Sequence, residues 1–565
     1  MSHYFLPEGV DAPLAAARAL GSLYPRTLRV SEEPLYLAAA NPSPTRVVAL
    51  VSGGGSGHEP LHGGFVGRGG LDAAVPGQIF ASPHNRQIFE ASRAVARPGG
   101  VLHIVKNYTG DLINFGIAAE RLAAEGIRVG RVVVQDDLAS GGDGVATGRR
   151  GTGSTVIVEK ILGAAADSGL DLDALVALGE EIVRRSASVA VARAAHTSPA
   201  TGRPAFELAD DEIEYGIGIH GERAQRSVTY PGARATVEQM VGELLTAVEP
   251  HDDVLLLVNG LGGTTNIELA GQYDVVARLL ADRGVRLQGA MVGTLVAALD
   301  MRGFSISLTS ARPEWTEWFR SPTGTPAFPP VETPAQPDPT TDGPARTESS
   351  VGAATATEDT ATDTLLARMV ELSERFRSHL THLDQQSGDG DFGDNLAGGL
   401  SRAQATRTSD ESGMSAAARV FLNDVGGTSG PLFGLIFQSV ARATDAATAS
   451  DRAAAFASSL RDGLAAVQRV GSAEPGDRTL VDALAPAAAA GGDLVDAAEA
   501  AAAGADRTAD LTARRGRASY VGDRALGSPD PGAVGLALVL LAAAHEWEPE
   551  SAPRVERIVT EWAAR

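Results

Sequence analysis

The chain has 565 residues, of which 44% are hydrophobic and 21% charged, a composition typical of a globular protein with more than one domain. Its formal net charge of −22 argues against a nucleic-acid or anionic-membrane partner, and the lack of cysteine excludes disulfides and thiolate chemistry. No stretch approaches the roughly 18 apolar residues of a membrane span, and the N-terminus shows no signal-peptide pattern. We therefore expect a cytoplasmic enzyme that binds neither nucleic acid nor membrane.

The first part of the chain alternates between strand-like and helix-like patterns. The strand-like runs are short and rich in valine, isoleucine and leucine, and they fall at residues 46–51, 101–105, 131–135, 253–259 and 304–308. Between them lie helical patterns, for which residues 172–190 serve as the example. The alternation predicts an α/β domain over residues 1–328, with glycine-rich segments after its strands, where such sheets bind ligands.

The stretch SGGGSGHEP, residues 52–60, places a histidine and a glutamate at the end of a glycine-rich segment. Glycine lets the backbone approach a small ligand, and a histidine can take a proton near neutral pH. His58 could therefore pack against a strand end, hold a phosphate or act as a base. His220, among glycine and small apolar residues, is in isolation typical of a satisfied core histidine, and we expect His62, His84 and His103 to be structural.

A composition break separates this domain from the rest of the chain. Eight prolines fall between Ser321 and Ala345, and from Glu332 to Ser350 the only apolar side chains are alanines and proline rings. Such a segment cannot bury enough surface to offset its ordering entropy. We predict a semi-extended linker over residues 329–358.

The chain beyond the linker has helical periodicity. Apolar residues recur at intervals of three or four and predict a first helix that ends near Asp384: Leu366, Met369, Leu372, Phe376, Leu380 and Leu383. Alanine- and leucine-rich stretches follow at residues 483–504 and 532–547. Residues 359–565 are therefore predicted to form an all-α helical bundle.

Closely spaced aspartates follow the first predicted helix, with glycines between them: Asp384, Asp389, Asp391 and Asp394. Converging carboxylates suit a hard cation such as Mg²⁺ or Ca²⁺. The EF-hand calcium pattern fails, because Asn395 or Leu400 stands where its final glutamate is required. A polar turn between two helices is an equally good interpretation of the spacing alone.

Other glycine-punctuated loops of this region carry phosphate-binding chemistry. Thr428 and Ser429 lie in GGTSGPLFG before an apolar helix, as in a phosphate cradle. Arg478 stands at the start of another helix, and residues 530–532 open a third. Each loop alone usually caps a helix. Together they favour a nucleotide–metal site at one end of the bundle.

Taken together, these motifs resemble the ATP-dependent dihydroxyacetone kinases. SGGGSGHEP, KNYTGDLINF, YGIGIHGE, LGGTT and LDMRGFSISL resemble the family's ketose-binding domain, and LDQQSGDGDFG, GGTSGPLFG, GDRTLVDAL and GRASYVGDRALGSPDPGA resemble its nucleotide-binding domain. The resemblance implies an α/β ketose-binding domain joined to an all-helical nucleotide-binding barrel or bundle. It implies phosphoryl transfer from ATP to a terminal hydroxyl of a short ketose, dihydroxyacetone first.

The resemblance also assigns roles to residues. His220 would form a covalent hemiaminal with the substrate carbonyl, and His58 and Asp111 would act as the acid/base pair. The implied substrate contacts are Gly55, Ser56, Gly57, His58, Lys106 and Asp111. Two Mg²⁺ ions would be held under the ATP phosphates by Asp384, Asp389 and Asp391. The implied nucleotide contacts are Asp394, Asn395, Thr428, Ser429, Gly471, Arg478, Asp530, Pro531 and Gly532.

The resemblance leaves other activities open. The same fold serves kinases of four-carbon ketoses such as erythrulose, and Asp394 stands where family members often carry a small or hydroxyl residue. A catalytically silent regulatory protein with the same domains would be expected to have lost His220 or an aspartate of the cluster. The kinases of the phosphotransferase system carry the two domains on separate chains. A lyase that cyclises FAD would need only the nucleotide domain. The family's members act as homodimers, in which the two sites face each other.

Overall fold

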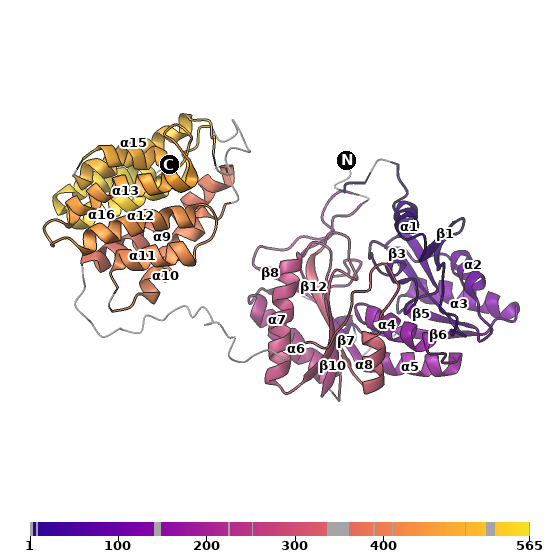
Figure 1. Cartoon of the computed structure of the whole chain (residues 1–565). Coiled ribbons are helices and arrows are strands. Elements are labelled where there is room, and N and C mark those ends of the chain that lie inside the picture. Colours follow the sequence, from indigo (N-terminus) through magenta and orange to yellow (C-terminus); the bar gives the residue numbers. More distant parts are fainter. Residues whose placement is uncertain are drawn as a thin grey trace. The chain divides into compact units, whose positions relative to one another are not determined.

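The computed structural model describes residues 4–6, 9–140, 148–199, 201–223, 227–250, 252–335, 361–387, 390–409, 411–491, 493–515 and 526–563. The chain divides into two compact units, residues 1–345 and 346–565 (Figure 1). The division falls inside the predicted linker. The bounds of that linker stay a prediction, because residues 336–360 lie outside the described residues.

The first half of the N-terminal unit contains a six-stranded sheet in the order β1-β2-β4-β3-β5-β6. The strands β4, β3, β5 and β6 run parallel, and the β1–β2 hairpin adds an antiparallel edge. Their bounds are Leu28–Glu32 (β1), Leu35–Ala39 (β2), Ala49–Ser56 (β3), Ala73–Ile79 (β4), Val101–Lys106 (β5) and Val129–Val134 (β6). The carboxyl ends of the parallel strands meet at one edge, where ligands bind in open α/β sheets.

Helices cover this sheet: α1 (Ala12–Leu23), α2 (Asn85–Val95), α3 (Thr109–Ala124), α4 (Ser154–Asp167) and α5 (Leu172–Arg184). The helix α4 is buried from Ser154 to Ala166 and packs against β3 of this sheet and against β7 and β12 of the second sheet. Because a surface helix needs only one apolar side, this all-round burial marks α4 as the central element between the two sheets.

The second sheet is mixed, in the order β11-β10-β12-β7-β8-β9, and only β10 and β11 are parallel. Its strands are Ser186–Ala194 (β7), Glu212–Tyr215 (β8), Ser227–Thr229 (β9), Asp253–Gly260 (β10), Arg286–Gly293 (β11) and Arg302–Ser310 (β12), with helices Ala233–Ala247 (α6), Asn266–Asp282 (α7) and Pro313–Arg320 (α8). The helix expected over residues 172–190 ends at Arg184. The segment after it is the central strand β7, whose small and β-branched residues are buried between neighbours.

The described part of the C-terminal unit is all helix, as predicted. Its helices are Ala361–Ser387 (α9), Phe392–Thr406 (α10), Gly413–Asn423 (α11), Ser429–Asp445 (α12), Arg452–Gly471 (α13), Val481–Ala489 (α14), Leu494–Arg507 (α15), Pro531–Trp547 (α16) and Ala552–Ala563 (α17). The helix α16 is buried at every position from Ala533 to Ala544, so it forms the centre of the bundle.

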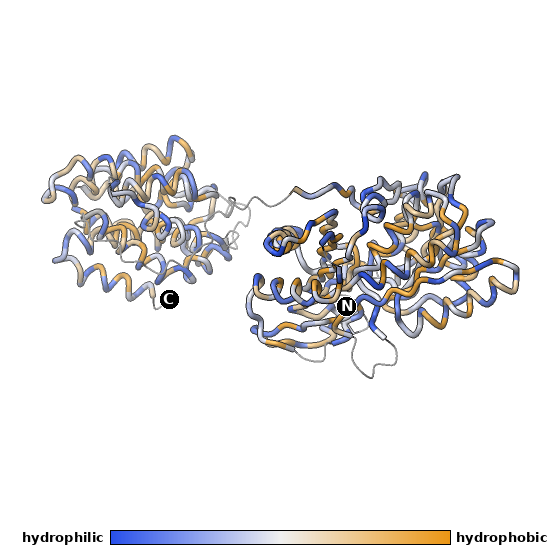
Figure 2. Tube along the Cα trace, turned by 90° about the horizontal axis from the view of Figure 1, so that it is seen from below, coloured by the Kyte–Doolittle hydropathy of each residue, from blue (hydrophilic) through white to orange (hydrophobic). Residues whose placement is uncertain are grey.

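Polar and apolar residues alternate along the other helices of both units (Figure 2). This pattern is expected of helices that bury one side. No helix in the described part of the chain is long and apolar enough to cross a membrane.

Candidate active site

The first part of the glycine-rich segment, residues 52–56, forms the carboxyl end of β3, and the chain turns at Gly57 directly after the strand. Gly57 has a left-handed φ of 99°, and a side chain there would meet the ring of Phe80 at 2.9 Å and Leu299 at 3.2 Å. Phe80 and Leu299 are themselves left-handed, each with φ of 57°. Left-handed non-glycine residues are strained and gather at functional sites, so this pair makes the surroundings of Gly57 a candidate site.

Three histidines surround the ring of Phe80. Its centroid lies 5.2 Å from that of His58, 5.0 Å from His196 and 5.3 Å from His220. The rings of His58 and His220 lie 4.8 Å apart, and Tyr108 lies edge-on to His220 at 4.6 Å. The structure therefore brings together two histidines that are 162 positions apart in the chain, His58 after β3 and His220 in the loop between β8 and β9.

Glu222 fixes the orientation of His220. Its carboxylate lies 2.8 Å from Nδ1 of His220 and accepts the backbone N–H of the same residue at 2.9 Å. Burial acts to raise the pKa of Glu222, but the hydrogen bond and charge of His220 outweigh it and lower that pKa to about 2. With Nδ1 bound to a carboxylate, Nε2 is the ring nitrogen left to react.

His58 is placed to act as a base. Its Nδ1 lies 2.8 Å from the carbonyl of Ala297, an arrangement in which Nδ1–H donates and Nε2 carries the lone pair. This Nε2 is buried without a hydrogen-bond partner among the described residues. Burial, then the charges of His220 and Lys106, hold the pKa of His58 well below its usual value. The ring is therefore neutral at neutral pH and can accept a proton.

Lys106, the last residue of β5, and Asp111, in the first turn of α3, lie near each other beside the histidines. Asp111 is 3% exposed in the first turn of α3, and its Oδ1 has no hydrogen-bond partner in the described part of the chain. Lys106 lies 2.8 Å from Nε2 of His62, whose Nδ1 lies 2.6 Å from Glu159. Burial lowers the pKa of Lys106, while the charges of Asp111 and Glu159 raise it. His62, which we expected to be structural, is thus the middle of a buried Lys–His–Glu chain beside the site.

The other predicted residues of this unit are placed as follows. Ser56 donates its hydroxyl to the carbonyl of Gly77 at 2.8 Å, so its side chain is already used within the fold. A side chain on Gly55 would meet the backbone of Phe80 at 2.8 Å. His84 caps α2, and His103 lies 2.9 Å from Ser92, so both have structural partners.

The sequence analysis did not identify Phe80, Tyr108, His196 or Glu222. Glu222 carried a signal, because it follows His220 by two positions in IHGE. The aromatic residues carried none, since their proximity to the histidines arises from the tertiary fold.

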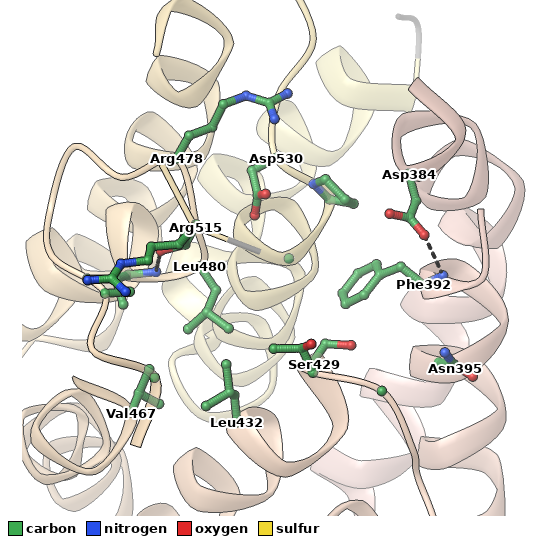
Figure 3. Close-up of a pocket in the computed structure, with 18 of the residues that line it drawn as sticks. Asp384, Phe392, Asn395, Ser429, Leu432, Val467, Arg478, Leu480, Arg515 and Asp530 are labelled. Carbon is green, nitrogen blue, oxygen red and sulfur yellow. Dashed lines mark hydrogen bonds between the residues drawn. The ribbon is translucent and has the colours of Figure 1, made fainter. Parts of the chain in front are cut away.

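The C-terminal unit contains a pocket of about 200 Å³ (Figure 3). Figure 3 shows Asp384 and Asn395 on one side of it and Leu432, Val467 and Leu480 on the other. The pocket is lined by Asp384, Asp391, Phe392, Asn395, Gly427, Thr428, Ser429, Leu432, Val467, Gly471, Ala473, Arg478, Thr479, Leu480, Val481, Arg515, Asp530, Pro531 and Gly532. It therefore has an acidic end, where a cation can bind, and an apolar end, which suits a planar base.

The acidic end is formed where α9 meets α10. Asp384 accepts the backbone N–H groups of Asp391 and Phe392 at 3.0 and 3.1 Å, which fixes its carboxylate at the pocket. Asp389 lies outside the described residues, and among the described residues no group of three acidic or histidine side chains forms a complete metal site. Asp394 does not line the pocket; it is exposed and pairs with Arg377 at 2.6 Å.

The remaining predicted contacts line the pocket at helix starts, except Gly471, which is the last residue of α13. The side chain of Thr428 makes no capping hydrogen bond to the first turn of α12, so N–H groups of this turn can bind an anion. Asp530 caps α16, and burial raises its pKa to about 6. Arg478 is 1% exposed, has a left-handed φ of 58° and donates to the carbonyl of Ser528 at 2.8 Å. Arg515, which the sequence analysis did not identify, is the other cation of the lining.

Comparison with known proteins finds a matching domain model in each unit. A Dak1 domain model matches residues 18–327, and a DAK2 domain model matches residues 386–545. Dihydroxyacetone kinase 2 of Saccharomyces cerevisiae is 37% identical over 538 residues, which cover 87% of this chain and 90% of the yeast protein. The chain belongs to the dihydroxyacetone kinase family.

Other members of this family carry different activities in their names. L-erythrulose 1-kinase of Mycolicibacterium smegmatis is 34% identical over 568 residues, which cover 95% of this chain and 98% of that protein. Triokinase/FMN cyclase of Rattus norvegicus is 35% identical over 537 residues, which cover 88% of this chain and 90% of the rat protein. The structure of the dihydroxyacetone kinase of C. freundii in complex with AMP-PNP and Mg²⁺ matches with a TM-score of 0.59 and 28% identity, over 96% of this chain and all of that one. The predicted family and fold class are thus confirmed.

Proposed function

We propose that this protein is an ATP-dependent kinase that phosphorylates a terminal hydroxyl of a short ketose, with dihydroxyacetone as the first candidate. The observation that carries the proposal is the arrangement of His220. Glu222 holds its Nδ1 at 2.8 Å, and its ring lies 4.8 Å from His58, whose Nε2 has no hydrogen-bond partner in the described part of the chain. A reactive nitrogen and a neutral base thus stand beside each other.

In the proposed first step, Nε2 of His220 adds to the carbonyl carbon of the ketose. A C–N bond forms, the carbonyl π bond breaks, and the oxygen takes a proton from solvent to become a hydroxyl. The ring gains positive charge in this step, and the carboxylate of Glu222 stabilises it through Nδ1–H. The resulting hemiaminal fixes the substrate's orientation, and a polyol without a carbonyl cannot form it.

In the proposed second step, His58 removes the proton from the attacking hydroxyl, and that oxygen bonds to the terminal phosphorus of ATP as ADP leaves. A base whose Nε2 is buried and unpartnered fits this role. Asp111, with an unpartnered Oδ1, is placed to hydrogen-bond to the substrate or to the base. The enzyme's contribution is then mainly positioning and charge stabilisation.

The pocket of the C-terminal unit is the proposed ATP site. Asp384, Asp389 and Asp391 would hold two Mg²⁺ ions, which neutralise phosphate charge when bound. The fit is supported by hard oxygen donors at the acidic end, where Asp384 is held by two backbone N–H groups. The uncapped start of α12 would receive phosphate oxygens, and the side with Leu432 and Val467 would receive the base.

Two finer assignments belong to the same proposal. Erythrulose is the alternative substrate, supported by the L-erythrulose 1-kinase relative. Cyclisation of FAD is the second candidate function, supported by the triokinase/FMN cyclase relative, and it would use the nucleotide pocket without His220. We also propose a homodimer in which the two kinds of site face each other.

An ADP-release assay tests the proposal. Dihydroxyacetone, glyceraldehyde, both erythrulose enantiomers and glycerol are compared at saturating Mg²⁺ and ATP, with FAD turnover measured separately without ketose. We expect the fastest release with dihydroxyacetone and little with glycerol. Erythrulose faster than dihydroxyacetone would reassign the substrate, and release without preference for a carbonyl compound would overturn the proposal.

A further inference from the structure

The loop after β7 forms one wall of an open pocket in front of His220. This pocket measures about 710 Å³ and is lined by His196, Ser198, Thr201, Arg203, Pro204, Ala205 and His220. Its polar groups are hydroxyls, imidazoles and one guanidinium, and none of the described residues that line it carries a carboxylate. This lining suits an anion.

The backbone holds this loop in one place. Ser198 and Arg203 are joined by an N–H···O bond of 2.8 Å, and Gly202 donates to the carbonyl of Ser198 at 2.7 Å. At the start of the loop, Asp300 accepts the backbone N–H and the hydroxyl of Thr197, each at 2.7 Å. The position of Arg203 relative to His220 is therefore set by the fold, although its side chain is exposed.

Two lining side chains have unused hydrogen-bonding capacity. The guanidinium of Arg203 has no carboxylate or carbonyl partner among the described residues. His196 is 5% exposed, and its Nδ1 lacks a partner in the same part of the chain. A buried polar atom without a partner is costly, so His196 is expected to gain a hydrogen bond when a ligand or ordered water enters.

The geometry of the proposed reaction requires a phosphoryl group near this pocket. His58 is fully buried, whereas the side chain of His220 is 18% exposed and lines the open pocket. A phosphoryl donor that reaches His220 through this pocket would pass Arg203, which lines it. Because the chain as a whole carries a net charge of −22, a local cation is needed to offset its repulsion of phosphate.

We propose that Arg203, with Ser198, Thr201 and His196, forms a phosphoryl subsite of the ketose-binding unit. The location of the ketose in this proposal rests on the proposed function. The ligand chemistry is a phosphate monoester, which has two sources: the phosphate of the sugar-phosphate product, or the terminal phosphate of ATP before transfer. Arg203 supplies a guanidinium, which matches phosphate geometry with paired N–H donors.

The test measures binding to the full chain in EDTA, where no transfer occurs. Dissociation constants are determined by calorimetry for dihydroxyacetone and for dihydroxyacetone phosphate. In Arg203→Gln we expect the constant for the phosphate to rise about 10-fold or more, the loss of one charge-assisted hydrogen bond, with that for dihydroxyacetone changed less than about 2-fold. Arg203→Lys should recover part of the loss. Arg29→Gln, an exposed arginine on the edge strand β1, should change neither constant.

Kinetics distinguishes the two phosphate sources. A rise in the product's inhibition constant at saturating ATP assigns the subsite to the product phosphate, and a rise in the KM for ATP assigns it to the terminal phosphate of the nucleotide. Unchanged values of both in Arg203→Gln, together with an unchanged dissociation constant, overturn the subsite. If the wild type binds dihydroxyacetone phosphate through Arg203 but shows no ketose-dependent ADP release, the proposed function fails and the subsite stands.

Discussion

In the N-terminal unit the proposed reacting groups are packed against one another, whereas in the C-terminal unit the acidic groups stand around an open pocket. His58, Phe80 and His220 are in ring contact, and the orientation of each histidine is set by a hydrogen bond to Nδ1. Asp384, near the end of α9, is held by two backbone N–H groups, and it lines a cavity of about 200 Å³ together with Asp391. Under the proposed function, covalent anchoring would depend on fixed geometry, while nucleotide binding would depend on charge that a metal can neutralise.

The largest expected effect is that of His220→Ala. Without the anchoring nitrogen the ketose loses both a bond and its orientation, so kcat/KM for dihydroxyacetone should fall about 1,000-fold or more. Steady-state kinetics checks this, and Mg·ATP binding to the same variant should be unchanged because the proposed nucleotide pocket is in the other unit. Wild-type kinetics in this variant would contradict the anchoring role.

The next largest effect is expected for substitutions in the C-terminal unit, which should impair phosphoryl transfer but not ketose binding. Asp384→Asn and Asp389→Asn should each lower kcat about 100-fold or more, because a metal-binding charge is lost, while the ketose adduct still forms. Asparagine at position 384 can still accept the two backbone N–H groups. Asp394→Asn is the matched control, since Asp394 pairs with Arg377 outside the pocket. An equal loss of kcat in Asp394→Asn would show that the effect comes from surface charge and not from metal binding.

Phe80→Ala should change the pH profile. Burial is the main cause of the lowered pKa of His58, and Phe80 stacks on that ring at 5.2 Å. Water admitted by the substitution should raise this pKa toward its usual value near 6.5, so His58 becomes protonated and inactive as a base at a higher pH. The ratio of kcat/KM at pH 6 to that at pH 8 should fall several-fold. Phe80→Leu, which keeps an apolar cover, should behave nearly as wild type; an unshifted profile in both variants would exclude His58 as the base.

The smallest expected effect concerns the division of the chain. Residues 332–350 are nearly devoid of apolar side chains, so limited proteolysis should cut there first and leave two folded parts. The N-terminal part should still bind ketose and the C-terminal part nucleotide, each within about 2-fold of the intact chain. Mass spectrometry of the fragments locates the cut. A first cut within either unit would show that the predicted bounds of the linker are wrong.

Local sequence patterns predicted many of the helices and strands, but not how these elements pack against one another. The periodicity from Leu366 to Leu383 correctly predicted α9, and the turn at residues 530–532 correctly predicted the start of α16 at Pro531. The strand β7 was interpreted as part of a helix, because Ser and Ala are common in both structures and its neighbours β12 and β8 are distant in sequence.

The candidate site shows the same limit. Motif resemblance selected His58, His220 and the aspartates. The hydrogen-bond partner of each Nδ1 was seen only in the structure: it is the carbonyl of Ala297 for His58 and the carboxylate of Glu222 for His220. Such partners are invisible to spacing rules unless they lie a few positions away, as Glu222 does.

The central claim is that His220 binds the ketose covalently through its carbonyl. The most direct measurement is the mass of the intact full chain under non-denaturing conditions, after incubation with dihydroxyacetone or with glycerol. The wild type should gain the mass of one dihydroxyacetone per chain and none with glycerol, and His220→Ala should gain neither, while Asp384→Asn should retain the adduct. Turnover of dihydroxyacetone without any adduct, or an adduct that persists in His220→Ala, would contradict the account.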